Sequence, residues 1–220
     1  MGISSPSLLR RTMVELYMAR TCRYGKLKVI GGDLHKQEAD VLITPANNRL
    51  SGREGLDAQV HLAAGDDLRQ KCRDISVVQR TKNLPPCPVT TCVTTEPYEL
   101  KEQFKHIIHM VGPDCRRPNQ DEARRELIRE AYASLFNELK SLKKIKTIVA
   151  PPISMGVFAY PHREGARMTL EILLDWLEND DKAKIDEYTI IVKERNFINN
   201  MRTVYRETED TLPGRDTTNE

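Results

Sequence analysis

The sequence predicts a three-layer α/β/α fold, in which helices cover both faces of a mixed, mostly parallel central sheet. Short runs of β-branched and aliphatic residues alternate with longer stretches whose apolar residues recur at helical spacing. Several short runs are apolar throughout, which is typical of strands covered on both faces. Strands that alternate with helices favour a parallel sheet. The 220 residues are enough for one such domain.

The first half of the chain contains four runs of β-forming residues and one long helical stretch. The predicted strands are residues 27–30, 39–44, 89–95 and 105–111. The second of these contains Val41, Leu42 and Ile43 in succession, which predicts a buried strand. A helix is predicted from residue 56 to about residue 73, between the second and third strands.

The second half continues the same alternation. Residues 121–142 have an apolar stripe at helical spacing, and so do residues 162–177. Residues 147–150 and 187–192 are the predicted strands that follow these two helices. Residues 196–205 are predicted to form a final helix, which completes a chain of alternating elements.

The two ends of the chain are expected to lie outside the domain, which is placed at residues 25–206. Residues 1–24 are predicted to form a helical extension, because apolar residues recur there at helical spacing. These residues are Leu9, Met13, Leu16 and Tyr17. Residues 207–220 are polar and contain a Pro–Gly pair, which predicts a disordered tail.

Composition and charge narrow the class of protein. Hydrophobic residues make up 39% of the chain and charged residues 30%, which is ordinary for a globular protein. No apolar run approaches the roughly 20 residues of a membrane span. The net charge of +2 gives no reason to expect nucleic-acid binding, and the lysines of residues 140–146 are interpreted as a solvated helix end. We expect a cytoplasmic or nuclear monomer, with a mitochondrial transit peptide left open by the N-terminal arginines.

The cysteines predict neither disulfide bonds nor a metal site. They are odd in number and contain no Cys-x-x-Cys pair; they are Cys22, Cys72, Cys87, Cys92 and Cys115. Reduced thiols are therefore expected, and no cofactor or metal is predicted.

Three segments at the predicted carboxyl ends of strands carry the chemistry of a ligand site: residues 44–55, 151–161 and 192–196. Ligands of open α/β sheets bind at this edge. Gly52 and Gly55 precede a helix, so backbone N–H groups and the helix N-terminus can approach a phosphate there. Two glycine-bearing loops at strand ends favour a nucleotide-like ligand.

The side chains of these segments have both a functional and a structural interpretation. Asp57 and His61 lie four residues apart on one helix face, but Asp57 could simply offset the helix dipole and His61 could be a solvated or capped residue. Asp33 either accepts a hydrogen bond from a ligand amine or caps the next segment. Ser154 and Gly156 form either a ligand loop or a plain strand-to-helix turn.

In order and spacing, these segments resemble the motifs of the macrodomain family over about residues 26–206. The family motifs are Gly-Asp-Leu, Asn-Ala-Ala-Asn, Val-Asp-x-x-Ile-His, Ile-His-x-Val-Gly-Pro and Ser-Thr-Gly-Val-Tyr-Gly-Tyr-Pro. Their counterparts are residues 32–34, 44–47, 56–61, 108–113 and 154–161. The resemblance implies a macrodomain that binds ADP-ribose.

Within that family, the chain resembles the MacroD-type hydrolases. This resemblance implies removal of mono-ADP-ribose from acidic side chains of proteins, with deacetylation of O-acetyl-ADP-ribose as a further activity. Asn47 would bind the distal ribose, Asp57 would position or activate a water near the anomeric carbon, and His61 would support Asp57 or the leaving group. A carboxylate suits this role, because its lone pairs can orient water against an oxocarbenium-like centre.

The resemblance also implies contacts to the rest of the ligand, with Asp33 on the adenine amine. The expected ADP-ribose-binding residues are Asp33, Leu34, Ala46, Gly52, Arg53, Glu54, Gly55, Leu56, Ser154, Met155, Gly156, Val157, Phe158 and Val192. The expected partners are ADP-ribose and mono-ADP-ribosylated proteins.

The chain departs from the family pattern at several of these positions. Thr44–Pro45 replaces the first Asn-Ala, and Arg53–Glu54 replaces two glycines in the loop that faces the distal ribose. Val192 stands where many members have an aromatic residue that stacks on adenine. These departures keep two alternatives open: a non-catalytic reader of ADP-ribosylated proteins, and a phosphatase that acts on ADP-ribose 1″-phosphate.

Overall fold

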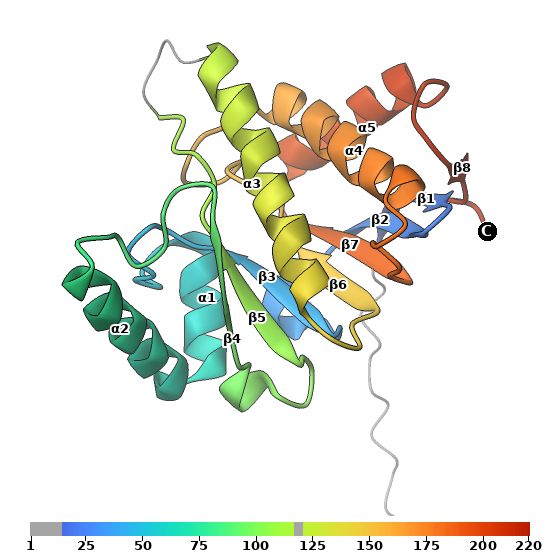
Figure 1. Cartoon of the computed structure of the whole chain (residues 1–220). Coiled ribbons are helices and arrows are strands. Elements are labelled where there is room, and N and C mark those ends of the chain that lie inside the picture. The colour runs from blue at the N-terminus through green and yellow to red at the C-terminus, as the bar shows by residue number, and fades with distance from the viewer. Residues whose placement is uncertain (1–14, 117–120) are drawn as a thin grey trace, which may run out of the picture.

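The computed structural model describes residues 15–116 and 121–220, which form alternating strands and helices (Figure 1). The strands are β1 (Leu16–Cys22), β2 (Gly25–Gly31), β3 (Val41–Pro45), β4 (Cys92–Thr95), β5 (His106–Met110), β6 (Thr147–Ala150), β7 (Glu187–Val192) and β8 (Arg215–Asp216). The helices are α1 (Gly55–Ala64), α2 (Asp66–Thr81), α3 (Asp121–Ser141), α4 (His162–Asn179) and α5 (Arg195–Thr208), and the short 3-10 helices are η1 (Leu34–Lys36) and η2 (Tyr98–Leu100).

All of these strands belong to one sheet, in the order β4-β5-β3-β6-β7-β2-β1-β8. The five strands from β5 to β2 run parallel, whereas β4 pairs antiparallel at one edge and β1 and β8 do so at the other. In Figure 1, α1 and α2 lie on one side of the sheet, and α3, α4 and α5 lie on the other. The predicted three-layer fold with a mixed, mostly parallel sheet is therefore confirmed.

Alternate residues of the central strands pack into two separate cores. Val41 and Ile43 of β3 belong to the core shared with α3, α4 and α5, whereas Leu42 belongs to the core shared with α1 and α2. Ile190 and Ile191 of β7 divide in the same way. Both faces of these strands are thus covered, which explains why their sequences are apolar throughout.

The predicted helix from residue 56 to about residue 73 is divided into α1 and α2 at Gly65. This glycine has φ +86°, a conformation that side chains with a Cβ rarely adopt. A Cβ at this position would also lie 2.7 Å from Cδ of Glu99. Gly65 therefore lets the chain turn between the two helices while it passes close to η2.

The prediction of a helical N-terminal extension is wrong for residues 16–22, which form β1; residues 1–14 lie outside the described residues. β1 pairs with β2 along its length and with β8 at residues 20 and 21. Met18 and Ala19 are buried in this arrangement. Helical spacing in the sequence was outweighed by pairing with strands and by burial, as often happens for segments of weak local preference.

The prediction of a disordered C-terminal tail is also wrong. Residues 207 and 208 complete α5, and Arg215 and Asp216 form β8. The buried guanidinium of Arg20 on β1 donates hydrogen bonds to carbonyl oxygens of the segment between them. The acceptors are Glu209, Leu212, Pro213 and Gly214. The tail therefore packs on the edge of the sheet.

None of the helices in the described residues is long and apolar enough to cross a lipid bilayer. All five cysteines are free thiols. The fold places the loops that follow β3 and β6 next to each other, because these two strands are parallel neighbours.

Candidate functional site

The candidate site lies at the carboxyl edge of the sheet, where the loop after β3 meets the loop after β6. The first loop leads into α1 and the second into α4. A Cβ on Gly55, the first residue of α1, would lie 3.4 Å from Cγ2 of Val157. The two segments singled out in the sequence are therefore in contact at the N-terminus of α1, where backbone N–H groups favour an anion.

Asn47 organises the loop after β3. Its Oδ1 accepts hydrogen bonds from the backbone N–H of Arg49 at 3.0 Å and of Ser51 at 3.2 Å, and its Nδ2 donates to Ser51 Oγ at 2.7 Å. Gly52 then follows with φ +57°. Asn47 is half-buried, and its hydrogen bonds stabilise the conformation of this loop without a ligand.

Asp57 lies on the first turn of α1 and is only 4% exposed. Burial raises the pKa of its carboxyl to about 6, although hydrogen bonds from Thr44 and from the backbone of Gly52 act in the opposite direction. Thr44 Oγ1 donates to Asp57 Oδ1 at 2.8 Å. In the sequence, Thr44 is only a departure from the family motif, whereas the structure makes it the hydrogen-bond partner of Asp57.

His61 lies one helical turn after Asp57 on α1, farther from the N-terminus of the helix, and is 1% exposed. Its Nε2 is 3.7 Å from Asp57 Oδ1, which is too long for a hydrogen bond. The backbone of Gly52 covers the imidazole, because a Cβ on Gly52 would lie 2.3 Å from Cγ of His61. Of the two roles implied for His61, a position behind Asp57 fits this geometry, whereas contact with a leaving group does not.

The loop after β6 is a tight turn with an exposed tip. Ser154 has φ +61° and is buried, and its Oγ has no hydrogen-bond partner among the described residues. The carbonyl of Met155 contacts Nε2 of His162 at 2.9 Å, which joins the turn to the first residue of α4. Gly156 and Val157 are exposed at the tip, so their backbone groups are open to a ligand.

The charged residues that replace glycines in the first loop, Arg53 and Glu54, are exposed just before α1. Nearby, the guanidinium of Arg116 lies 5.8 Å from the ring centre of Phe158. Arg116 was missed in the sequence, although it follows β5 and the carboxyl-edge rule applies to that strand as well. The surface around the loops therefore carries charges of both signs.

Asp33 follows β2 and is already engaged by two lysines. Lys193 Nζ lies 2.6 Å from its Oδ1, and Lys36 Nζ lies 2.9 Å from its Oδ2. The hydrogen bonds from Lys193 and Lys36 lower the pKa of Asp33 to about 2. Lys193 was also missed in the sequence, although it comes directly after Val192 at the end of β7.

Several expected ligand-binding residues have their side chains in the core, so only their backbone groups can face a ligand. These residues are Leu34, Ala46, Met155 and Val192. Leu56 is half-buried at the start of α1. The structure thus brings the loops after β3 and β6 together, while Asp33 and Val192 lie at the ends of β2 and β7.

Parallel strands with glycine-bearing loops and helix N-termini at their carboxyl ends define an α/β module suited to a phosphate-containing ligand. Residues 43–169 match the family model described as the Macro domain, and the chain belongs to the macro domain family.

The chain is 33% identical over 183 residues to the rat ADP-ribose glycohydrolase MACROD1; the match spans 83% of this chain but only 64% of the rat protein. It is 30% identical over 174 residues to an O-acetyl-ADP-ribose deacetylase of Cronobacter turicensis, which covers 79% of this chain and 93% of that protein. Among solved structures, the Oceanobacillus iheyensis macrodomain with ADP superposes with a TM-score of 0.79 at 24% identity, over 90% of this chain and 99% of the other.

Proposed function

We propose that this chain binds ADP-ribose between the loops after β3 and β6 and hydrolyses mono-ADP-ribose from acidic side chains of proteins. The observation that carries the proposal is the position of Asp57. It is a buried carboxylate with a pKa of about 6, in the first turn of α1, which begins at Gly55 next to Val157. The names of the rat and Cronobacter relatives, a glycohydrolase and a deacetylase of ADP-ribose compounds, support the same ligand.

The binding part of the proposal follows from the backbone. The diphosphate lies at the N-terminus of α1, where N–H groups and the helix dipole favour negative charge. The exposed tip at Gly156 and Val157 closes on it from the other loop. Asp33 accepts a hydrogen bond from the adenine amine once Lys193 or Lys36 turns away, which solvent-exposed lysines can do at small cost.

The chemical part of the proposal assigns base catalysis to Asp57. Asp57 takes a proton from a water molecule, the water oxygen bonds to the anomeric carbon, and the bond from that carbon to the ester oxygen breaks. The leaving group is a carboxylate of ordinary pKa near 4, so it departs as an anion and needs no general acid. This agrees with the position of His61, which is covered by Gly52 and cannot protonate a leaving group.

A second candidate function, a reader that binds but does not hydrolyse, is favoured by one observation. Asp57 is 4% exposed and held by Thr44, so a substrate water reaches it only if the loop at Gly52 moves. The exposed charges of Arg53 and Glu54 at this loop suit contact with a modified protein.

The test is incubation of the purified full chain with a protein that carries Glu-linked mono-ADP-ribose, with Asp57→Ala in parallel. Asp66→Ala is the matched control, because Asp66 is a fully exposed acidic residue in the first turn of α2. Hydrolase activity predicts loss of the label with the wild type and the control variant, and retention with Asp57→Ala. O-acetyl-ADP-ribose and ADP-ribose 1″-phosphate serve as second and third substrates.

Calorimetry with ADP-ribose separates the remaining outcomes. A wild-type chain that binds ADP-ribose and leaves every label intact is a reader. A chain that binds no ADP-ribose contradicts the proposal as a whole, provided that its circular dichroism shows a folded protein.

A further inference from the structure

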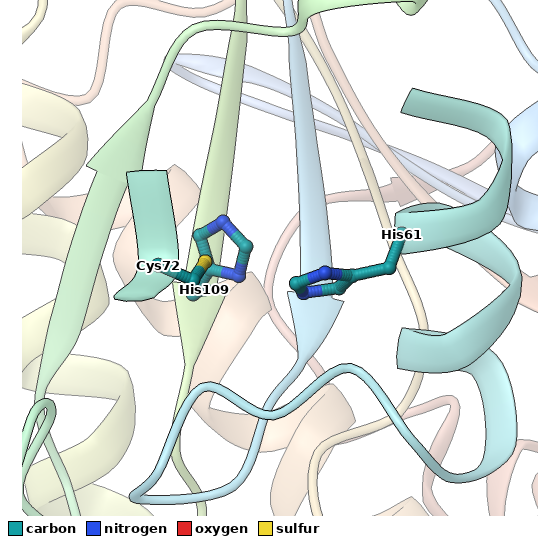
Figure 2. A group of neighbouring side chains, drawn as sticks. All are labelled: His61, Cys72 and His109. Carbon is teal, nitrogen blue, oxygen red and sulfur yellow. The ribbon is translucent and has the colours of Figure 1, made fainter. Parts of the chain in front are cut away.

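Three potential metal ligands from distant parts of the sequence meet in the core between α1, α2 and β5. They are His61, Cys72 and His109 (Figure 2). One ligand atom from each side chain lies within 4.8 Å of the other two. Each residue is at most 3% exposed. The two imidazole rings meet edge to face with their centres 5.6 Å apart, and Figure 2 shows Cys72 beside His109, with His61 pointing toward them from α1.

The hydrogen bonding of these side chains is incomplete. His109 Nε2 lies 3.1 Å from Thr95 Oγ1, which leaves Nδ1 buried with no partner among the described residues. Both ring nitrogens of His61 are likewise buried without a hydrogen bond there. Buried polar atoms nearly always have a hydrogen-bond partner, because a buried atom without one has lost its hydrogen bonds to water and has formed no others. Each imidazole thus has at least one unpaired ring nitrogen next to a buried thiol, which points to a ligand that binds one nitrogen of each ring together with the sulfur.

We propose that His61, Cys72 and His109 bind a Zn²⁺ ion. Two imidazoles and one thiolate are a ligand set that Zn²⁺ prefers, and carboxylate-binding cations such as Mg²⁺ or Ca²⁺ do not. In a tetrahedral site, Zn–S bonds of about 2.3 Å and Zn–N bonds of about 2.0 Å place the ligand atoms about 3.5 Å apart. The ligand atoms lie within 4.8 Å of one another, so metal binding requires the side chains to move closer together, and a water molecule would take the fourth position.

The charges around the group suit a cation. Asp57 Oδ1 lies 3.7 Å from Nε2 of His61, so a carboxylate stands on one side of the site. Both rings are buried, and each would bind the metal as a neutral imidazole through one ring nitrogen. The Cys72 thiol would bind as the thiolate, because the metal ion displaces its proton on binding.

The site would fasten α2 to the body of the domain. Cys72 is on α2, which lies at the outer side of α1 in Figure 1, and His109 is on β5 of the central sheet. An ion bound to both connects these elements through the core and holds His61 in place behind Asp57. Because the ligands are buried, the ion enters during folding or when α2 moves outward. The inference stands whether or not Asp57 is catalytic.

The experiment uses the full chain, unfolded in chelator and refolded with Zn²⁺ or with Co²⁺ as a spectroscopic probe. After dialysis, we expect one zinc ion per chain by elemental mass spectrometry. We expect the Co²⁺ form to show a thiolate-to-metal charge-transfer band and the intense ligand-field bands of tetrahedral coordination. Neither measurement on the wild type depends on a variant that folds.

Two cysteine variants locate the site. Cys72→Ser should abolish the charge-transfer band and weaken Zn²⁺ binding by at least about tenfold. Cys115→Ser is the matched control, since Cys115 is a half-buried thiol on the loop after β5, and it should leave both readouts unchanged. A folded wild-type chain that retains no zinc overturns the proposal, and so does zinc retention that is equal in the wild type and Cys72→Ser.

Discussion

Thr44 Oγ1 donates a hydrogen bond to Asp57 Oδ1 at 2.8 Å, which joins the end of β3 to the first turn of α1. Both residues are buried, at 0% and 4% exposure. The contact supplies a donor to a carboxylate that has little access to water, so the hydroxyl of Thr44 is part of what allows Asp57 to be charged inside the protein.

Replacement of this hydroxyl should therefore destabilise the fold. We expect Thr44→Val, which keeps the shape of the side chain, to lower the free energy of unfolding by about 1–3 kcal/mol, because the buried carboxylate loses a donor. Thr44→Ser keeps the donor and should lose less. Urea denaturation of both variants is the measurement, and equal stability of Thr44→Val and the wild type would contradict this account.

Gly52 and Gly156 lie in the two candidate ligand loops but differ in what surrounds them. A Cβ on Gly52 would meet the imidazole of His61 at 2.3 Å, and its φ of +57° is unfavourable for alanine. A Cβ on Gly156 would meet nothing within 4 Å. We expect Gly52→Ala to cost more than about 1 kcal/mol of stability and Gly156→Ala to stay within about 0.5 kcal/mol of the wild type. Thermal unfolding of the pair checks this, and a reversed order would show that the loop is arranged differently.

The engagement of Asp33 by lysines should limit the affinity for ADP-ribose at the proposed site. Lys193→Ala removes one competitor for the carboxylate, and exposed ion pairs are worth at most about 1 kcal/mol. We therefore expect the affinity to rise by up to about fivefold in calorimetry. Lys82→Ala, on an exposed lysine at the end of α2, is the control. A marked loss of affinity in Lys193→Ala would instead mean that Lys193 itself contacts the ligand.

Arg20 should hold the C-terminal segment against the sheet. Its guanidinium is 5% exposed and donates to four carbonyl groups of residues 209–214. We expect Arg20→Met to lower stability by at least about 2 kcal/mol and to speed hydrogen exchange in this segment, because buried acceptors lose a charged donor. Arg215→Met, on the exposed side of β8, should do neither. Unchanged exchange in Arg20→Met would show that other contacts hold the segment.

Asp40 should make stability depend on pH. Burial acts to raise its pKa, but Lys105 and the backbone N–H groups of Lys146 and Thr147 donate to it and lower the pKa overall. The pKa of Asp40 is therefore lower in the folded chain than in the unfolded chain, where it is about 3.9. The ionised carboxylate stabilises the fold at pH values above about 3.9, and this stabilisation is lost as the pH falls through the pKa of the folded chain. We expect Asp40→Asn to be less stable than the wild type by about 1–2 kcal/mol at neutral pH, with the difference shrinking below about pH 4. Urea denaturation between pH 6 and pH 3, with Glu38→Gln as an exposed control, tests this; a difference that stays constant over this range contradicts it.

Local patterns in the sequence determined the layers of the fold. The strands predicted at residues 147–150 and 187–192 coincide with β6 and β7, because continuous apolar runs between helices report burial on both faces. The positions of the two candidate ligand loops, after β3 and after β6, were also predicted, since glycines and helix starts after buried strands are visible in the sequence. These signals work because each depends on residues that are close together along the chain.

Only the tertiary structure decided the features whose partners lie far apart in the chain. Residues 16–22 form β1 because they pair with β2 and β8, although the spacing of their apolar residues predicted a helix. Thr44 became the partner of Asp57 because α1 folds back over the end of β3. Cys72 reached His61 and His109 because two helices and a strand pack in one core. Pairing, burial and convergence of side chains depend on which elements meet in space, and no local pattern contains that information.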